Sequence, residues 1–423
     1  MKTDFSITQL ADPAIQEAER VFRACVHCGF CLSSCPTYTL LGDELDSPRG
    51  RIYLIKDMLE NDRPATEEVV PHIDKCLSCL ACQTICPSNV NYMHLIDHAR
   101  VHVEQTYKRP FADRTIRSLL GWLMPRPGLF RWALMGAKLA RPFKGLMPGR
   151  LKQMVALAPE GLLTKPGIAN QTYPAEGEQK RRVALLPGCV QQVIGAEIND
   201  ATIRLLTRLG CEVVVLNEAY CCGSITHHMG QEEPTRARMR ANIDAWSVEI
   251  DKGLDAIVIN ASGCGTTMKD YGFMFAEEPD YAARAATIST LSKDISEIVG
   301  DLEPGEPRNL RVTYHSACSL RNGQGIEATP MALLRRAGFE VSEPKETHMC
   351  CGSAGTYNML QSEIAGELLD RKIANIDRTG PQVIATGNIG CITQLRSGTD
   401  VPVIHTVELL DWATGGPKPA ALG

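Results

Sequence analysis

Two copies of one cysteine spacing constrain the first hundred residues more than any other feature. Each copy reads C-x2-C-x2-C-x3-C-P, and the second begins 51 residues after the first. The eight thiols are Cys25, Cys28, Cys31, Cys35, Cys76, Cys79, Cys82 and Cys86. The 17 cysteines among 423 residues are too few for a small fold held together by disulfide bonds. They are too many for a cytosolic protein whose thiols have no function. The start of the chain lacks a secretory apolar stretch, so we expect a cytoplasmic protein whose thiols bind metal.

This spacing is typical of bacterial ferredoxins with two iron–sulfur clusters, in which the fourth cysteine of each run binds the other cluster. Three closely spaced thiolates wrap around three irons, and the fourth iron needs a ligand from outside that loop. We therefore assign one [4Fe-4S] cluster, cluster 1, to Cys25, Cys28, Cys31 and Cys86. The other, cluster 2, is assigned to Cys76, Cys79, Cys82 and Cys35. Structural zinc sites usually pair cysteines at longer intervals, so iron–sulfur clusters are favoured over zinc.

The second half of the chain contains a duplication. Four cysteines, two of them in a Cys-Cys-Gly triplet, recur after 129, 129, 129 and 127 residues. The eight residues, four in each copy, are Cys189, Cys221, Cys222, Cys264, Cys318, Cys350, Cys351 and Cys391. Cys211 aligns with Phe339 of the other copy, so we expect it to be a small buried core residue. Such a duplication predicts two domains of the same fold.

Each copy alternates short apolar stretches with helical ones, which predicts an α/β unit with a parallel sheet. The expected strands of the first copy are 183–187, 212–216 and 255–260, with helices at 200–209 and 235–250; in the second copy, strands are expected at 310–314 and 382–386. The cysteines follow the strands, and ligands of parallel sheets gather at the carboxyl ends of strands. We expect the four thiols of each copy to converge on a metal or redox site rather than to be separate core cysteines. An iron cluster, a zinc ion and a redox-active thiol pair all remain open, and no catalytic residue is assigned.

Five histidines lie close to these motifs. His94, His98 and His102 fall on one face of a predicted helix, and a solvated helix face is favoured there over a metal site. His315 and His348 precede cysteines of the second copy by two or three residues. We expect them to hydrogen-bond cluster sulfur or to replace a missing ligand.

Four regions follow from these patterns, and the fold class is multidomain α+β. A helical two-cluster ferredoxin-type domain spans 1–107, a basic, proline-rich bridging segment spans 108–180, and the two cysteine-rich α/β repeats span 181–300 and 301–423. Helices of the first domain are expected at 13–24, 51–60 and 93–107. A loose segment, 158–182, is rich in proline and glycine and leads into the repeats.

The bridging segment is strongly basic in an otherwise acidic chain. Residues 108–152 hold eleven Lys or Arg and one acid, Asp113, whereas the net charge of the whole chain is −5. Tryptophan and leucine interleave with these cations, a composition that suits an anionic membrane surface or an acidic partner. A linker that buries its apolar residues against the repeats is an equal alternative. Nucleic acid is not expected as a partner because the acidic remainder would repel phosphate. No run approaches the roughly 18 apolar residues of a membrane-spanning helix.

The chain resembles the iron–sulfur subunits of glycolate oxidase (glycolate dehydrogenase) over nearly its whole length. The resemblance rests on residues 23–31 (RACVHCGFC), 36–38 (PTY), 40–46 (LLGDELD), 48–55 (PRGRIYLI), 242–246 (NIDAW), 261–265 (ASGCG), 350–357 (CCGSAGTY) and 388–391 (NIGC). The CCG repeats also resemble those of heterodisulfide reductase, which close with CxxC. Here Ala261 and Asn388 replace the first cysteine of that pair.

The resemblance implies a subunit that oxidises no substrate by itself. FAD-binding partner subunits would oxidise glycolate to glyoxylate, and this chain would pass the electrons to quinone or another membrane acceptor from the inner face of the cytoplasmic membrane. The absence of a Gly-rich dinucleotide motif agrees with placing FAD on the partners only. The same relay in an anaerobic glycerol-3-phosphate, lactate or heterodisulfide system is the alternative, as is a zinc-binding or redox-sensing scaffold.

Overall fold

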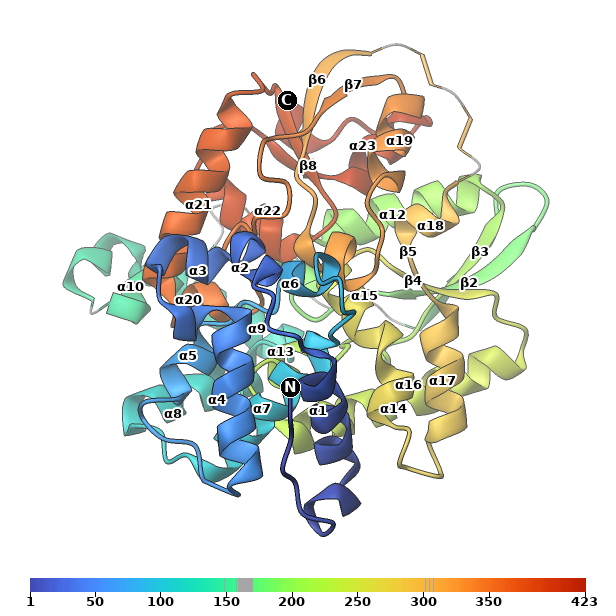
Figure 1. The fold of residues 1–423 in the computed structure, drawn as a ribbon. Helices are drawn as coiled ribbons and strands as arrows, with labels where there is room; N and C mark the ends of the chain where they lie inside the picture. The colour runs from blue at the N-terminus through green and yellow to red at the C-terminus, as the bar shows by residue number, and fades with distance from the viewer. Residues whose placement is uncertain (148, 157, 159–169, 301, 304, 307) are drawn as a thin grey trace.

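A helical N-terminal region lies against two α/β units in the computed structural model (Figure 1). The structure describes residues 1–147, 149–156, 158, 170–300, 302–303, 305–306 and 308–423. The residues 159–169 of the predicted loose segment lie outside this description. The multidomain α+β fold class predicted from the sequence is confirmed.

The N-terminal region contains short helices around the cysteine loops and three longer ones. Its elements are η1 (Gln9–Ala11), α1 (Pro13–Ala24), α2 (Phe30–Ser34), α3 (Pro36–Leu41), η2 (Glu44–Asp46), α4 (Pro48–Glu60), α5 (Val70–Asp74), α6 (Ala81–Thr84) and α7 (Tyr92–Thr106). Asp12 caps α1 by accepting a hydrogen bond from the Ala14 N–H, and Pro13 occupies the first turn, where its missing donor costs nothing. A core of its own, with Phe22, Ile55 and Ile96 fully buried, holds α1, α4 and α7 together.

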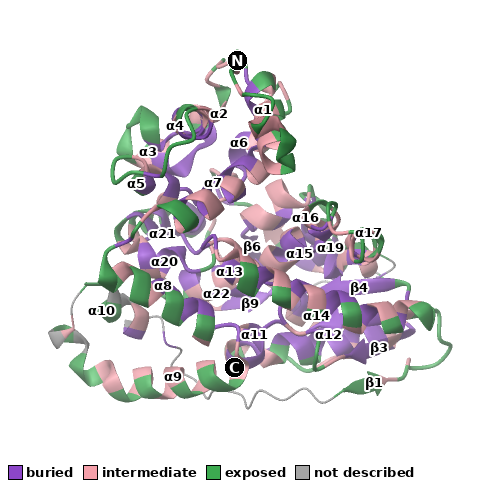
Figure 2. Ribbon diagram, turned by 90° about the horizontal axis from the view of Figure 1, so that it is seen from below, coloured by how far each residue is buried: buried purple, intermediate pink, exposed green. Residues whose placement is uncertain are grey.

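The bridging segment is helical rather than irregular. It forms α8 (Phe111–Leu123), α9 (Pro127–Ala140), η3 (Arg141–Leu146) and α10 (Gly149–Ala156). In Figure 2 helix α9 runs along one edge of the molecule and carries mostly exposed and half-exposed residues. Arg109 and Arg117 anchor the start of the segment to the N-terminal region, because both form ion pairs with Asp74 at 2.7 and 2.8 Å.

The first α/β unit is built on a five-stranded sheet with the order β1-β3-β2-β4-β5. The strands are β1 (Gln171–Tyr173), β2 (Arg181–Leu186), β3 (Cys211–Val215), β4 (Ala256–Ile259) and β5 (Ser292–Asp294). All pairings are parallel except that of the edge strand β1 with β3. The helices are α11 (Gln191–Ile194), α12 (Ala196–Arg208), α13 (Ser224–His227), α14 (Glu232–Asp251), α15 (Ser262–Lys269), α16 (Tyr271–Met274), α17 (Ala282–Leu291) and α18 (Ile295–Ile298).

The second α/β unit has a four-stranded, fully parallel sheet in the order β7-β6-β8-β9. The strands are β6 (Arg308–Tyr314), β7 (Phe339–Ser342), β8 (Val383–Thr386) and β9 (Val403–His405). The helical elements are η4 (Ser319–Gly323), α19 (Thr329–Arg336), α20 (Tyr357–Leu360), α21 (Ser362–Asp377), α22 (Ile389–Arg396), α23 (Thr406–Ala413) and η5 (Ala420–Leu422). The expected strands of both copies fall on β2, β3, β4, β6 and β8, with ends that differ by one or two residues.

The two α/β units pack through one continuous core. Residues of both sheets belong to the same hydrophobic cluster, with Leu205 and Leu409 among its fully buried members. At its edge the buried carboxylate of Asp411 pairs with Arg204 at 2.6 Å and with Arg208. The His405 ring hydrogen-bonds the carbonyl of Asn260 at 2.7 Å. The ion pairs of Asp411 thus join α23 to α12, and the His405 contact joins the carboxyl ends of β9 and β4.

Candidate functional site

The four thiols assigned to cluster 1 line one cavity in the N-terminal region. Cys25 and Cys28 come from the loop between α1 and α2, Cys31 from the first turn of α2, and Cys86 from the end of the second cysteine run. Three residues of α4, Pro48, Arg49 and Ile52, also line this cavity. Cys28 is exposed, so this cavity lies at the surface of the protein.

The four thiols assigned to cluster 2 line a second cavity. Its wall holds Cys76, Cys79 and Cys82 of the second run together with Cys35 of the first. All four thiols are buried, so this cavity lies deeper than the first. The structure thus brings together both crossed sets of four, and the assignment of each set to a cluster stays a prediction.

The two cysteine loops have the same backbone conformation. His27 and Ser78, which occupy equivalent positions, both have left-handed φ values, of 57° and 49°. Two residues later Gly29 and Leu80 repeat the feature, at 86° and 58°. A residue with a side chain adopts this region at a cost of about 1–2 kcal/mol, so three such residues need a compensating interaction. Thiolate loops closed around a cluster supply one, and the donor set and backbone therefore fit a [4Fe-4S] group at each place.

The thiols of these cavities raise one another's pKa. Burial, together with Cys25 and Cys28, raises the pKa of Cys31 to about 11. Burial and the neighbouring Cys79 and Cys76 raise the pKa of Cys82 well above its usual value. Such groups ionise together only when a cation compensates their charge, as a metal centre does.

A buried guanidinium lies beside the second cavity, and the sequence patterns did not single it out. Arg51 of α4 is 1% exposed, and its Nη1 lies 4.0 Å from the Sγ of Cys35. It also donates to the Thr37 hydroxyl at 3.1 Å and to the His72 carbonyl at 2.6 Å. Burial by itself would lower the pKa of Arg51, but the neighbouring Cys76 and other groups raise it above its usual range. Arg51 therefore stays charged next to the thiols.

The eight cysteines of the two repeats line a single large cavity between the α/β units, which we call the thiol chamber. Each repeat contributes a cysteine three or four residues after β2 or β6, the two cysteines of its double-cysteine loop, and a cysteine in the first turn of the helix after β4 or β8. This agrees with the expectation for the carboxyl ends of parallel strands. The lining cysteines are Cys189, Cys221, Cys222, Cys264, Cys318, Cys350, Cys351 and Cys391. The sequence predicted convergence within each repeat; the structure also brings the two sets to one shared cavity.

Thiols contact one another in both repeats, and the second repeat adds a contact between Cys350 and Cys351. Hydrogen bonds between thiols join Cys189 to Cys221 and Cys222 to Cys264. The equivalent Cys318 lies 3.8 Å from Cys350, and Cys351 is likewise joined to Cys391. All seventeen cysteines of the chain are free thiols in this structure. The hydrogen bond from Cys189 lowers the pKa of Cys221 to about 7, the range in which a thiol becomes a ligand or nucleophile.

The bridging segment closes one side of the thiol chamber. Met124, Phe130, Leu134 and Met154, all from this segment, are among its lining residues. Other apolar side chains of the segment face outward: Trp122 is 50% exposed, Trp132 66%, Leu139 80% and Phe143 61%. The helices of this segment therefore bury one apolar face and expose another. A linker packed on the repeats and a surface that docks on a membrane or an acidic partner are thus compatible alternatives.

The three cysteine-lined cavities adjoin one another. The first and second share Pro48, Cys82 and Tyr92, and the second shares Leu77 and Ser78 with the thiol chamber. Two hydrogen bonds between segments far apart in sequence lie near the boundary between the second cavity and the thiol chamber. The Asn322 amide donates to the Cys79 carbonyl at 2.8 Å, and the Tyr357 hydroxyl donates to the Lys75 carbonyl at 2.9 Å.

The histidines predicted to share one face of α7 differ in their surroundings. The His94 ring stacks on Phe273 at 3.5 Å and hydrogen-bonds Asp270 at 2.9 Å, so it lies in the contact with the first α/β unit. The ring of His102 instead hydrogen-bonds the Arg63 carbonyl. The prediction of a solvated face was wrong for His94, because this end of α7 packs against a unit 176 residues away in sequence, which helical periodicity does not reveal.

Comparisons with known proteins agree with this arrangement. A 4Fe-4S dicluster domain family matches residues 21–90, and a cysteine-rich domain family matches residues 183–269 and 312–396. The glycolate oxidase iron-sulfur subunit of Escherichia coli (strain K12) is 39% identical over 417 residues, which cover 98% of this chain and 99% of that protein. The probable glycolate oxidase iron-sulfur subunit of Bacillus subtilis (strain 168) is 32% identical, over 92% of this chain and 94% of that protein.

A more distant relative covers about half of the chain. Lactate utilization protein A of Bacillus subtilis (strain 168) is 25% identical over 240 residues, 54% of this chain and 99% of that protein. The domain matches confirm the predictions of two [4Fe-4S] clusters and of a duplicated cysteine-rich domain.

Proposed function

Since the chain belongs to the family of glycolate oxidase iron–sulfur subunits, we propose that it carries electrons from FAD-binding subunits that oxidise glycolate to glyoxylate toward a membrane quinone. The observation that carries this proposal is the series of adjoining cavities, from cluster 1 through cluster 2 to the thiol chamber. When bound, a [4Fe-4S] cluster accepts and releases one electron at a time. The chain itself holds and shields these groups and sets their surroundings.

The surface around the cluster 1 cavity supports an entry point for electrons. Val26, Phe30 and Tyr53 are 67%, 59% and 56% exposed beside the exposed Cys28. A cluster of exposed apolar side chains marks a protein contact more often than a free surface. We propose that the FAD-binding subunits dock here, where the route from flavin to the first cluster is shortest.

The bridging helices support an exit toward a membrane. Trp132, Leu139 and Phe143 are exposed on a segment whose sequence is strongly basic, the composition of an interfacial anchor for anionic lipid. Phe130 and Leu134, which lie on α9 with Trp132 and Leu139, line the thiol chamber, so an apolar acceptor would pass from the surface to the chamber along α9. Among the described residues, none of the helices has the length and apolar character needed to span a bilayer. A peripheral position on the inner face of the cytoplasmic membrane follows as part of the proposal.

The proposal is tested on the complex with its flavoprotein subunits, prepared without oxygen. Addition of glycolate is expected to reduce the flavin first, then to produce EPR signals of reduced [4Fe-4S] clusters, and finally to reduce a short-chain quinone. Omission of this chain should leave flavin reduction intact and stop quinone reduction. Clusters that stay oxidised while quinone is reduced at the full rate would refute the relay.

Lactate is the second candidate substrate of the partner subunits, because lactate utilization protein A is similar to about half of the chain. Parallel assays with glycolate and lactate separate the two. Faster cluster reduction with lactate would move the assignment to a lactate-oxidising system and leave the relay role of this chain unchanged.

A further inference from the structure

The two repeats differ at one buried position beside the thiols. His315 of the second repeat follows β6 three residues before Cys318, and the first repeat has Leu186 at the equivalent place before Cys189. His315 is 2% exposed, and neither of its ring nitrogens has a hydrogen-bond partner. A buried imidazole left unpaired is costly, so these nitrogens point to a ligand.

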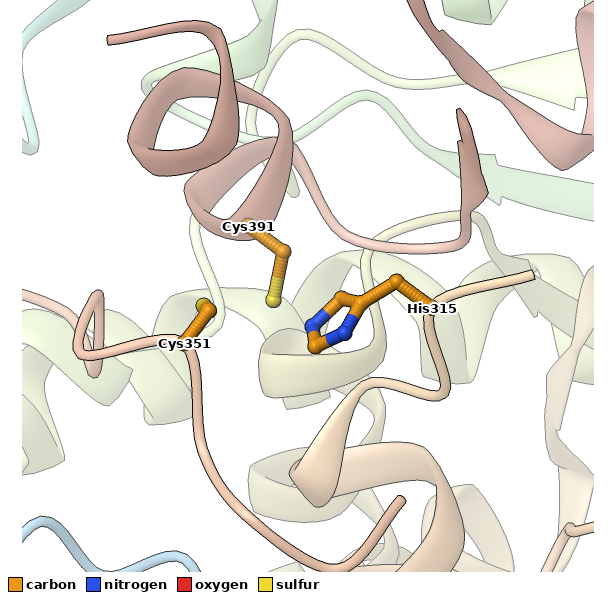
Figure 3. Close-up of side chains that lie close together, drawn as sticks. All are labelled: His315, Cys351 and Cys391. Carbon is orange, nitrogen blue, oxygen red and sulfur yellow. The ribbon is translucent and has the colours of Figure 1, made fainter. Parts of the chain in front are cut away.

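Two thiols complete a set of ligands around this ring. Figure 3 shows the His315 ring facing the sulfur of Cys391, from α22, with Cys351, from the double-cysteine loop, on the other side of that sulfur. The three ligand atoms lie within 4.8 Å of one another, and all three residues are buried. One ion with bonds of about 2.0–2.3 Å bridges such a spacing after small side-chain rotations.

Neighbouring groups hold the three ligands in place. The backbone N–H of His315 donates to the Ala385 carbonyl at 2.8 Å, which ties the residue to the end of β8. The side-chain amide of Asn388 lies 3.6 Å from the Cys391 sulfur, where it donates to the thiolate. The first repeat has Ala261 at the position of Asn388, so it lacks this amide as well as the histidine.

We propose that His315, Cys351 and Cys391 bind a single zinc ion in the second repeat, with its fourth position toward the thiol chamber. One imidazole and two thiolates are a donor set that zinc prefers, and three protein ligands leave a position for water or a further ligand. Cys351 and Cys391 line the chamber, whereas His315 does not, so the free position lies on the chamber side. This inference does not depend on the proposed function, because it concerns metal content and not electron transfer.

The test is metal analysis of the full-length chain purified without oxygen. His315→Leu, which installs the residue of the first repeat, is expected to lose about one zinc ion per chain while iron and acid-labile sulfide stay at wild-type values. His348→Leu is the matched control, because His348 precedes Cys350 in the same repeat but stands outside the three ligands. It is expected to keep all of its zinc.

X-ray absorption at the zinc edge supplies a readout of the ligands themselves. The wild type is expected to show nitrogen and sulfur neighbours, and His315→Cys is expected to keep the ion and exchange nitrogen for sulfur. The EPR signals of the two N-terminal clusters report whether each variant is folded. If His315→Leu misfolds, the zinc-edge spectrum of His315→Cys decides whether residue 315 binds the ion. Unchanged zinc in His315→Leu, an unchanged zinc spectrum in His315→Cys, or iron in place of zinc at this site would overturn the proposal.

Discussion

Replacement of Arg51 by methionine removes a buried positive charge from the wall of the cluster 2 cavity. The methionine is close in length and apolar, so it fills the space of the side-chain stem without a charge. The buried carboxylate of Asp46, which lies 3.7 Å from Arg51, keeps His72 at 2.7 Å and Lys75 at 2.8 Å as partners. We therefore expect the variant to fold and to assemble both clusters.

The expected effect is a lower reduction potential of cluster 2. At the 4.0 Å between Arg51 Nη1 and Cys35 Sγ, two unit charges interact by about 4 kcal/mol at an effective dielectric constant of about 20. An added electron is shared over a whole cluster, and Asp46 offsets part of the guanidinium charge, so roughly 1–2 kcal/mol remains. Since about 1.4 kcal/mol corresponds to about 59 mV for one electron, we expect a decrease of roughly 40–90 mV.

The assay is a dye-mediated redox titration followed by EPR at low temperature. Arg49→Gln is the matched control: Arg49 lines the cluster 1 cavity from the same helix, but its side chain is 29% exposed and solvent screens its charge. Arg51→Lys, which retains a cation, should recover part of the potential. A potential unchanged within error in Arg51→Met, or a larger shift in Arg49→Gln, would refute the electrostatic reasoning.

Three further changes test other parts of the molecule. Cys79→Ser should abolish glycolate-dependent quinone reduction by the complex, while reduction of the flavin persists. The control Cys211→Ala changes a buried cysteine outside the ligand sets and should retain both reactions. Equal quinone reduction in the two variants would contradict the relay. The double change Trp132→Ser and Leu139→Ser should weaken sedimentation with anionic vesicles at least about tenfold, whereas the exposed Val248→Ser should not; equal binding by all three proteins would exclude docking through α9. Burial, aided by Glu197, raises the pKa of Glu408 to about 7 in the folded protein, whereas the pKa of an unperturbed glutamate in the unfolded chain is about 4.3. The unfolded state therefore loses this proton first, and the stability of the folded protein falls as the pH rises from about 4.3 to 7. Glu408→Gln should therefore raise the free energy of unfolding by about 1–3 kcal/mol at pH 8 and by little at pH 5, as measured by denaturant titration; an equal gain at both pH values would contradict the linkage.

Much of the local structure was predictable from the sequence. The Asp-Pro start of α1 at residues 12 and 13 marks its first turn, and the predicted range 13–24 agrees with the structure. The cysteine spacing predicted two [4Fe-4S] clusters, because three thiols at such intervals form one loop whatever surrounds them. The 129-residue repeat predicted two copies of one α/β fold, because equal patterns of buried and exposed positions favour equal folds.

The sequence by itself thus determined which thiols act together within each loop and which segments form strands and helices, since both depend on neighbours along the chain. Only the tertiary structure decided that eight thiols share one chamber, that Arg51 lies charged beside Cys35, and that α9 covers the chamber with Phe130. It also decided that the unpaired ring of His315 lies close to the sulfurs of Cys351 and Cys391. The physical reason is that these contacts join residues far apart in sequence, and burial of apolar surface, which brings them together, is not directional and leaves no spacing to recognise.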